Sequence, residues 1–261
     1  MPFKRKRRIT VLISGSGSNL QALIDACNTP RLPSSAITFV LSSRSDAYGL
    51  TRASTHVPPI LTSVCALKTF LNRNPGSRRA DYDAEVARQV VDSRPDLVVL
   101  AGWMHILSEA FLDILNGVTQ PPPAPALPPP DPTSIPTQIE PIPSTRPQTD
   151  SDQVLPSSHP QSFPIPCINL HPALPGAFDG ANAVGRAYEA FARGEIQNTG
   201  VMVHRVVKEV DRGEPIVIRQ LRMEHNETLH DLEERIHQIE HDIIVEGARI
   251  VLEDLEKMGS S

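Results

Sequence analysis

The spacing of hydrophobic residues changes repeatedly along the first 115 positions, and each change predicts a strand or a helix. A β-branched run at residues 9–13 predicts a strand, and a glycine-rich turn at 14–19 leads from it into a helix at 20–26. We expect Ser18 or Asn19 to cap that helix. The same succession is repeated, with strands predicted at 37–42 and 59–62 and helices at 46–55, 80–93 and 108–115.

The segment at residues 96–102, Asp-Leu-Val-Val-Leu-Ala-Gly, is an almost unbroken apolar run. A strand that is apolar on both faces is typical of a parallel sheet covered by helices on both sides. Strands and helices in alternation therefore indicate a doubly wound α/β sheet. The loop at 103–107 leaves this strand at the carboxyl edge, where it either forms the wall of a ligand pocket or packs onto the core.

The C-terminal part contains one more short strand, at residues 168–171, and a helix at 181–193. Alternating segments at 198–207 and 216–221 flank the tight acidic turn 209–215, which predicts an antiparallel hairpin at the edge of the sheet. The chain then reads as a long amphipathic helix at 228–255, capped by Asn226 or Thr228. The expected fold is thus a mostly parallel sheet with an antiparallel edge hairpin.

The composition changes abruptly between these two parts. Sixteen of the 26 prolines lie between Pro121 and Pro166, among Ser, Thr, Gln and Asp, so this segment cannot bury enough apolar surface to fold. We predict a disordered, proline-rich insertion at residues 119–165. It interrupts a single domain, 1–261, whose core comprises 9–115 and 166–255. The proline runs also fit a partner of the SH3 or WW type, although a passive insertion is the simpler interpretation.

Charge and cysteine content narrow the class of partner. The formal charge of −5, from 30 acidic and 25 basic residues, gives no general attraction to nucleic acid or to a membrane. No apolar run predicts a membrane span, and the basic start lacks the apolar region of a signal peptide. The three cysteines are far apart and show no C-x-x-C spacing. We expect a cytoplasmic protein with reduced thiols that binds small molecules and needs no metal.

Two polar side chains give the strand at 168–171 its chemistry. Because side chains alternate along a strand, Asn169 and His171 point to the same side. An amide donor beside an imidazole, at the carboxyl edge of the sheet, suits acyl transfer.

The glycine-rich turn is the second candidate site. Its backbone N–H groups precede a helix and favour an anion such as phosphate, although an ordinary tight turn is the alternative interpretation. The residues concerned are Gly15, Ser16, Gly17, Ser18 and Asn19.

Three motifs occur in a specific order: Gly15-Ser16-Gly17-Ser18-Asn19-Leu20-Gln21, Asn169-Leu170-His171-Pro172 and Glu209-Val210-Asp211-Arg212-Gly213. With them the chain resembles the phosphoribosylglycinamide formyltransferases of purine synthesis, over residues 9–115 and 168–255. The resemblance implies a Rossmann-like, doubly wound formyltransferase fold. It also implies 10-formyltetrahydrofolate as formyl donor and 5-phosphoribosylglycinamide as acceptor.

The same resemblance implies the roles of individual residues. Asn169, His171 and Asp211 correspond to the catalytic residues, residues 15–19 to the phosphate loop, and Glu240 to a carboxylate that holds the acceptor's ribose. The folate pocket is expected to include Met104, His105, Ile106, Leu107 and Val207. The chain departs from the family in several places: His105 stands where many relatives have an arginine, His237 stands where some have a glutamine, and the loop after His171 is one residue shorter.

The chemistry agrees with these roles. The acceptor's amine attacks the formyl carbon, and Asn169 together with a protonated His171 stabilises the resulting oxyanion. We expect Asp211 to raise the pKa of His171 and to pass the amine's proton through water to the departing folate nitrogen.

Two alternatives remain at this point. A methionyl-tRNA formyltransferase shares the folate chemistry, but the acidic chain shows no tRNA-binding domain after the last helix. A catalytically silent phosphometabolite-binding or scaffold protein has no chemical reason to keep Asn169, His171 and Asp211 together.

Overall fold

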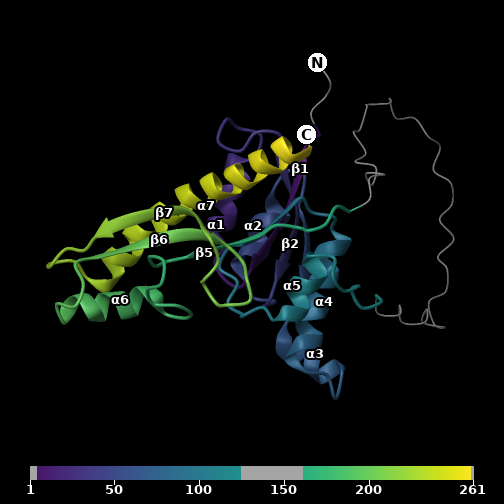
Figure 1. Ribbon diagram of the computed structural model, residues 1–261, viewed down its shortest axis with the longest axis horizontal. Helices are drawn as coiled ribbons and strands as arrows, with labels where there is room; N and C mark the ends of the chain where they lie inside the picture. The colour runs from purple at the N-terminus through teal and green to yellow at the C-terminus, as the bar shows by residue number, and fades with distance from the viewer. Residues whose placement is uncertain (1–4, 125–160, 260–261) are drawn as a thin grey trace.

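A computed structural model describes residues 5–124 and 161–259 of the chain. These residues form one seven-stranded sheet with helices on both faces (Figure 1). The strands are β1 (Arg7–Ile13), β2 (Ser35–Ser42), β3 (Leu61–Val64), β4 (Leu97–Leu100), β5 (Cys167–His171), β6 (Asn198–Arg205) and β7 (Pro215–Arg222). The helices are α1 (Ser18–Ala26), α2 (Tyr48–Thr55), α3 (Leu67–Arg73), α4 (Arg79–Asp92), α5 (Glu109–Leu115), α6 (Ala183–Ala192) and α7 (Leu229–Gly259).

The order of the strands is β3-β2-β1-β4-β5-β6-β7. The first five in this order pair in parallel, whereas β6 and β7 pair antiparallel and form the edge hairpin. The order reverses between β1 and β4, which is the switch point where such sheets bind ligands. The predicted fold class is therefore confirmed.

Two apolar layers cover the sheet. On one face, α1 and the long helix α7 pack against each other, and α7 also crosses the strands β4 to β7 (Figure 1). On the other face, α4 and α5 enclose a second core around Tyr82 and Phe111. The central strand β4 is buried along its whole length, as its unbroken apolar run predicts.

Several predicted boundaries and caps differ from the structure. Helix α3 was not predicted, and β3 begins at Leu61, two residues later than expected. Neither Ser18 nor Asn19 caps α1, because the helix already begins at Ser18 and is preceded by Gly17. At α7, in contrast, Thr228 and Asp231 form the reciprocal hydrogen bonds of a capping box, which confirms the predicted start.

Most of the predicted insertion lies outside the described residues, so its disorder stays a prediction. Its described end joins the core: Ile165 is buried, and its N–H donates a 2.8 Å hydrogen bond to the carbonyl of Leu115 at the end of α5. In the described ranges no helix is long and apolar enough to cross a membrane.

Candidate functional site

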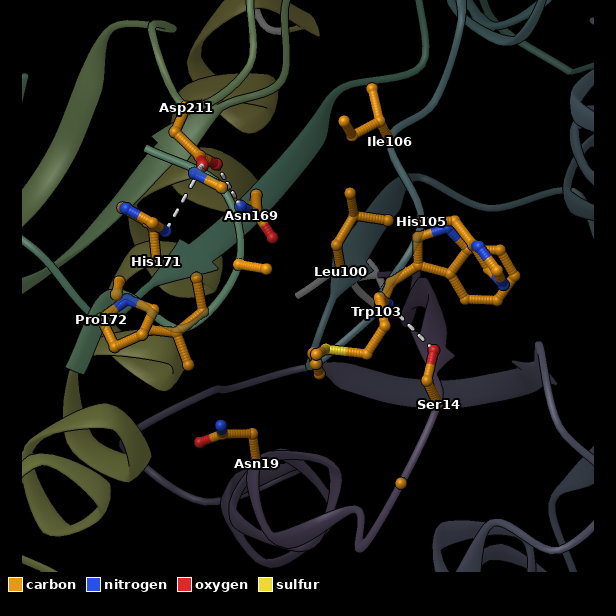
Figure 2. A pocket seen from close by; sticks show the side chains of 18 of the residues that line it. Ser14, Asn19, Leu100, Trp103, His105, Ile106, Asn169, His171, Pro172 and Asp211 are labelled. Carbon is orange, nitrogen blue, oxygen red and sulfur yellow. Dashed lines mark hydrogen bonds and ion pairs between the residues drawn. The ribbon is translucent and has the colours of Figure 1, made fainter. Parts of the chain in front are cut away.

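A cavity of about 730 Å³ opens at the carboxyl edge of the sheet, beside the switch point between β1 and β4. Asn169, His171 and Asp211 lie on one side of it, and Ser14, Trp103 and His105 on the other (Figure 2). Every site residue predicted from the sequence lines this cavity, from the phosphate loop to Val207 and Glu240. The fold thus brings together three motifs that are far apart in the chain.

Asp211 connects the two polar residues of β5. Its Oδ1 accepts a 3.1 Å hydrogen bond from Asn169 Nδ2, and its Oδ2 lies 3.5 Å from Nδ1 of His171. The backbone of Asp211 is left-handed, with φ 55°, a conformation that Asp tolerates better than most residues. The turn is closed by Gly213, where a Cβ would lie only 1.6 Å from the carbonyl oxygen of Arg205. The motif Asp-Arg-Gly therefore fixes the carboxylate in place.

A second histidine, His204, belongs to this cluster and was not predicted. It stands directly opposite Asn169 in the β5–β6 pair, and its Nε2 lies 3.1 Å from Asn169 Nδ2 and 3.4 Å from Asp211 Oδ1. Its Nδ1 contacts the carbonyl of Arg205 at 2.9 Å. Only the register of the two strands places His204 here, and that register cannot be read from either strand alone.

The environment of Asp211 keeps its carboxylate ionised. Burial alone raises its pKa, but the hydrogen bond with His204, the N–H of Gly180 and the charges of His171 and His204 outweigh burial and lower the pKa to about 2. The Gly180 N–H donates to Oδ2 at 2.8 Å. Asp211 is therefore a permanent negative charge beside two imidazoles.

The protonation expected for His171 is corrected by the structure. Asp211 does raise its pKa, as expected, but burial has the larger effect and, together with the charge of His204, leaves the pKa below the ordinary value of 6.5. The residue is 3% exposed, and its Nε2 is buried and has no hydrogen-bond partner among the described residues. The resting ring is thus mainly neutral near pH 7.

The predicted phosphate loop, residues 15–19, is held by close backbone packing. A Cβ on Gly17, whose φ is 71°, would lie 2.5 Å from the Cα of Gly49 in α2. The N–H of Gly49 donates to the carbonyl of Gly15 at 3.1 Å, and Nε of Arg52 donates to the carbonyl of Ser16 at 2.9 Å. Helix α2 therefore supports the loop from outside, while the cavity lies on its other side.

Asn19 and Glu240 meet between α1 and α7. The amide of Asn19 donates a 3.0 Å hydrogen bond to Glu240, and both side chains are buried. Oδ1 of Asn19 has no partner among the described residues. Burial raises the pKa of Glu240, although the hydrogen bond from Asn19 and the charge of His237 act in the opposite direction. A polar ligand that enters here meets both an unused acceptor and a buried carboxylate.

The predicted folate segment forms the opposite wall. Met104, Ile106 and Val207 are exposed at the cavity, whereas Leu107 is buried. Burial, and next the charge of Arg79, lower the pKa of His105, whose ring lies edge-on to Trp103 and Tyr82. This neutral aromatic setting differs from the arginine expected of many relatives.

Ser14 joins the two walls. Its Oγ accepts a hydrogen bond from the N–H of Met104 at 2.9 Å (Figure 2). It accepts a second one from the hydroxyl of Ser43 at 2.7 Å. The end of β1, which begins the phosphate loop, is thereby tied to the folate segment.

Cys167 lies near the site but is fully packed. Burial raises the pKa of its thiol, so it is not an activated nucleophile. In the part of the chain that the structure describes, no group of three or more His, Cys, Asp or Glu side chains is arranged to hold a metal ion.

Comparison with known proteins gives a consistent result. A family model described as formyl transferase matches residues 7–119 and 152–247. A phosphoribosylglycinamide formyltransferase of Schizosaccharomyces pombe is 38% identical over 248 residues, which cover 94% of this chain and 97% of that protein. One from Saccharomyces cerevisiae is 36% identical over 96% of this chain and 99% of its own length.

Solved structures agree with the fold. The crystal structure of glycinamide ribonucleotide transformylase 1 from Symbiobacterium toebii is 28% identical and superimposes with a TM-score of 0.66, covering 95% of this chain and 89% of that one. Since the family model matches most of the chain and both fungal relatives match nearly all of it, the chain belongs to the formyl transferase family.

Proposed function

We propose that this chain transfers the formyl group of 10-formyltetrahydrofolate to the amine of 5-phosphoribosylglycinamide, a step of purine synthesis. One observation carries the proposal: a single cavity contains a glycine-rich anion loop, a buried carboxylate and a His-Asp pair. The relatives that match nearly the whole chain bear the name of this enzyme.

The acceptor binds along the α1 and α7 side. Backbone N–H groups of residues 15–19 hold its phosphate at the start of α1, where the helix dipole also favours an anion. Glu240 accepts hydrogen bonds from the ribose hydroxyls, and Oδ1 of Asn19 is available to a ligand N–H or O–H. This arrangement directs the acceptor's amine toward His171.

The folate enters from the opposite wall. Met104, Ile106 and Val207 give its ring system an apolar surface, and the formyl group reaches the centre of the cavity between the two walls. His105 contributes a neutral aromatic edge instead of a cation.

His171 acts first as a base and then as an acid. The neutral ring, whose Nδ1 lies 3.5 Å from Asp211 Oδ2, removes the proton as the amine attacks the formyl carbon. The carbonyl electrons move onto the oxygen, which accepts a hydrogen bond from the side-chain amide of Asn169. When the intermediate collapses, the carbon–nitrogen bond to folate breaks and His171 returns the proton to that nitrogen. Asp211 stabilises the imidazolium between the two steps.

An assay with two different formyl acceptors distinguishes the proposed function from its alternatives. Purified protein is given 10-formyltetrahydrofolate with either phosphoribosylglycinamide or methionyl-tRNA, and tetrahydrofolate release is followed by absorbance. We expect transfer to the small acceptor alone. Transfer only to the tRNA supports the methionyl-tRNA alternative, and binding of both substrates without turnover supports a silent binding protein.

Two further proposals concern the cellular setting. We place the enzyme in the cytoplasm, a setting that suits its free thiols at Cys27, Cys65 and Cys167. A partner of the SH3 or WW type on the proline-rich insertion stays a proposal, since that segment lies outside the described residues.

A further inference from the structure

The loop between β5 and α6 lies beside Asp211 and His171. Its Gly180 N–H donates to Oδ2 of Asp211 at 2.8 Å, the same oxygen that faces His171. The backbone of Ala177, three residues earlier, favours the protonated form of the His171 ring. Residues 177–180 therefore bind Asp211 directly and influence the protonation of His171.

Arg186, in the first turn of α6, holds the middle of this loop. Its Nη2 donates to two successive carbonyls, those of Phe178 at 2.5 Å and Asp179 at 2.8 Å, and its guanidinium lies 5.9 Å from the centre of the Phe178 ring. Phe178 has a φ of 52°, a conformation that costs a non-glycine residue free energy and needs support from its surroundings.

The carbonyls of Phe178 and Asp179, which Arg186 holds, lie in the chain between Ala177 and Gly180. Fixing the carbonyls of residues 178 and 179 also fixes the peptide plane that carries the Gly180 N–H, because each peptide bond is rigid. Arg212 adds a second tie, since its Nη2 lies 2.6 Å from the side chain of Asp179. This ion pair involves the side chain of Asp179, whereas Arg186 binds the backbone carbonyls and so fixes the orientation of the backbone.

We propose that Arg186 is a positioning residue for formyl transfer, which sets the geometry of His171 and Asp211 through the backbone of residues 177–180. The inference rests on the proposed function. Arg186 itself does not line the cavity and touches neither reacting group.

The expected effect follows from the hydrogen bonds that are lost. In Arg186→Met the loop relaxes, Gly180 no longer holds Asp211 Oδ2 toward His171, and the Ala177 backbone moves from the ring. The other charged groups that face His171 remain: Asp211 in the turn after β6, His204 in β6 and Asp179 in the loop. Loss of about one net hydrogen bond predicts a roughly 5- to 10-fold lower kcat, with both KM values within about 2-fold of wild type.

The experiment combines kinetics with a titration that needs no turnover. Wild type, Arg186→Met, Arg186→Lys and the control Arg193→Met are compared for kcat, both KM values, Tm and the pKa of His171, followed by NMR of labelled histidine. Arg193 ends the same helix and pairs with Glu195 at the surface. We expect the pKa of His171 to fall in Arg186→Met, to change less in Arg186→Lys, and to stay constant in the control.

Each outcome decides the inference. A folded Arg186→Met with wild-type kcat and His171 titration overturns it, as does a raised KM with unchanged kcat. If Arg186→Met does not fold, Arg186→Lys takes its place, and wild-type values in that variant overturn the inference. An inactive wild type contradicts the proposed function, whereas the His171 titration still tests the role of Arg186.

Discussion

The side-chain amide of Asn19 donates a 3.0 Å hydrogen bond to the carboxylate of Glu240, although 221 positions separate them in the chain. The contact links the start of α1, where the phosphate loop ends, to the middle of α7. It is made by two buried polar groups, and burial raises the pKa of the carboxyl. The protein therefore keeps a carboxyl group in a place where its ionisation weakens the fold.

Glu240→Gln should bind the acceptor less tightly and yet be more stable. A carboxyl group whose pKa is raised by folding disfavours the folded state as pH rises, so Glu240 costs stability at pH 7. We expect Tm at pH 7 to rise by roughly 2 °C and this gain to vanish in acid. The KM for the acceptor should rise about 10-fold, since a hydrogen bond to a charged group is lost.

Glu234→Gln is the matched control on the same helix, because Glu234 is exposed and only faces His230. Glu234→Gln should change neither Tm nor the KM for the acceptor. A less stable Glu240→Gln protein with unchanged acceptor KM would contradict the role given to this carboxylate.

Gly17→Ala should disrupt the phosphate loop. The new Cβ would lie 2.5 Å from the backbone of Gly49, in a left-handed conformation that disfavours alanine. We expect a loss of about 2–4 kcal/mol in the free energy of unfolding, measured by urea denaturation. In Gly15→Ala, where no atom lies within 4 Å of the added Cβ, stability should stay within about 0.5 kcal/mol of wild type. Equal losses in both variants would show that the close approach to Gly49 is unimportant.

Ser14→Ala should weaken binding of the folate, although Ser14 belongs to the strand that begins the phosphate loop. The N–H of Met104 loses its acceptor, so the folate wall loses one support. We expect the KM for the formyl donor to rise about 5-fold. Ser43→Ala removes the neighbouring hydroxyl and leaves the bond from Met104 intact, so it serves as the control. A donor KM that is unchanged in Ser14→Ala would sink the prediction.

Activity should depend on pH through His171. Because burial lowers its pKa below 6.5 and the ring must be neutral to accept the amine's proton, kcat should fall as pH decreases through that lowered pKa. Asp211, with a pKa of about 2, stays ionised over this range and contributes no step. Rate profiles between pH 5 and 8 test this, and a rate that increases toward acid would favour a catalytic imidazolium instead.

Much of the fold was predictable because local pattern and global topology agree. The apolar run of β4, the alternation of β6 and the capping box of α7 each predicted the element that the structure contains. The cap of α1 was not, because the helix begins at Ser18 after Gly17 and the side chain of Asn19 binds Glu240 instead. Such competing partners are tertiary contacts, which a local pattern does not contain.

In the candidate site, too, local patterns predicted some residues, and tertiary contacts that the sequence does not reveal determine the others. The period of a strand places Asn169 and His171 on one face, and the resemblance adds Asp211, Glu240 and the two loops. His204 and Arg186 were missed, because strand register places the first and a loop's backbone path the second. Asp211 does raise the pKa of His171, as expected, but burial has the larger effect and lowers the net pKa, and the sequence does not reveal how deeply the ring is buried.

The most direct test of the central claim is the transfer of a labelled formyl group to phosphoribosylglycinamide by wild type and Asp211→Asn at saturating substrates. The asparagine keeps the size of the side chain but removes the charge that stabilises the imidazolium. We predict a kcat at least about 100-fold lower, with both KM values nearly unchanged. Equal kcat values in two equally folded proteins would contradict the account.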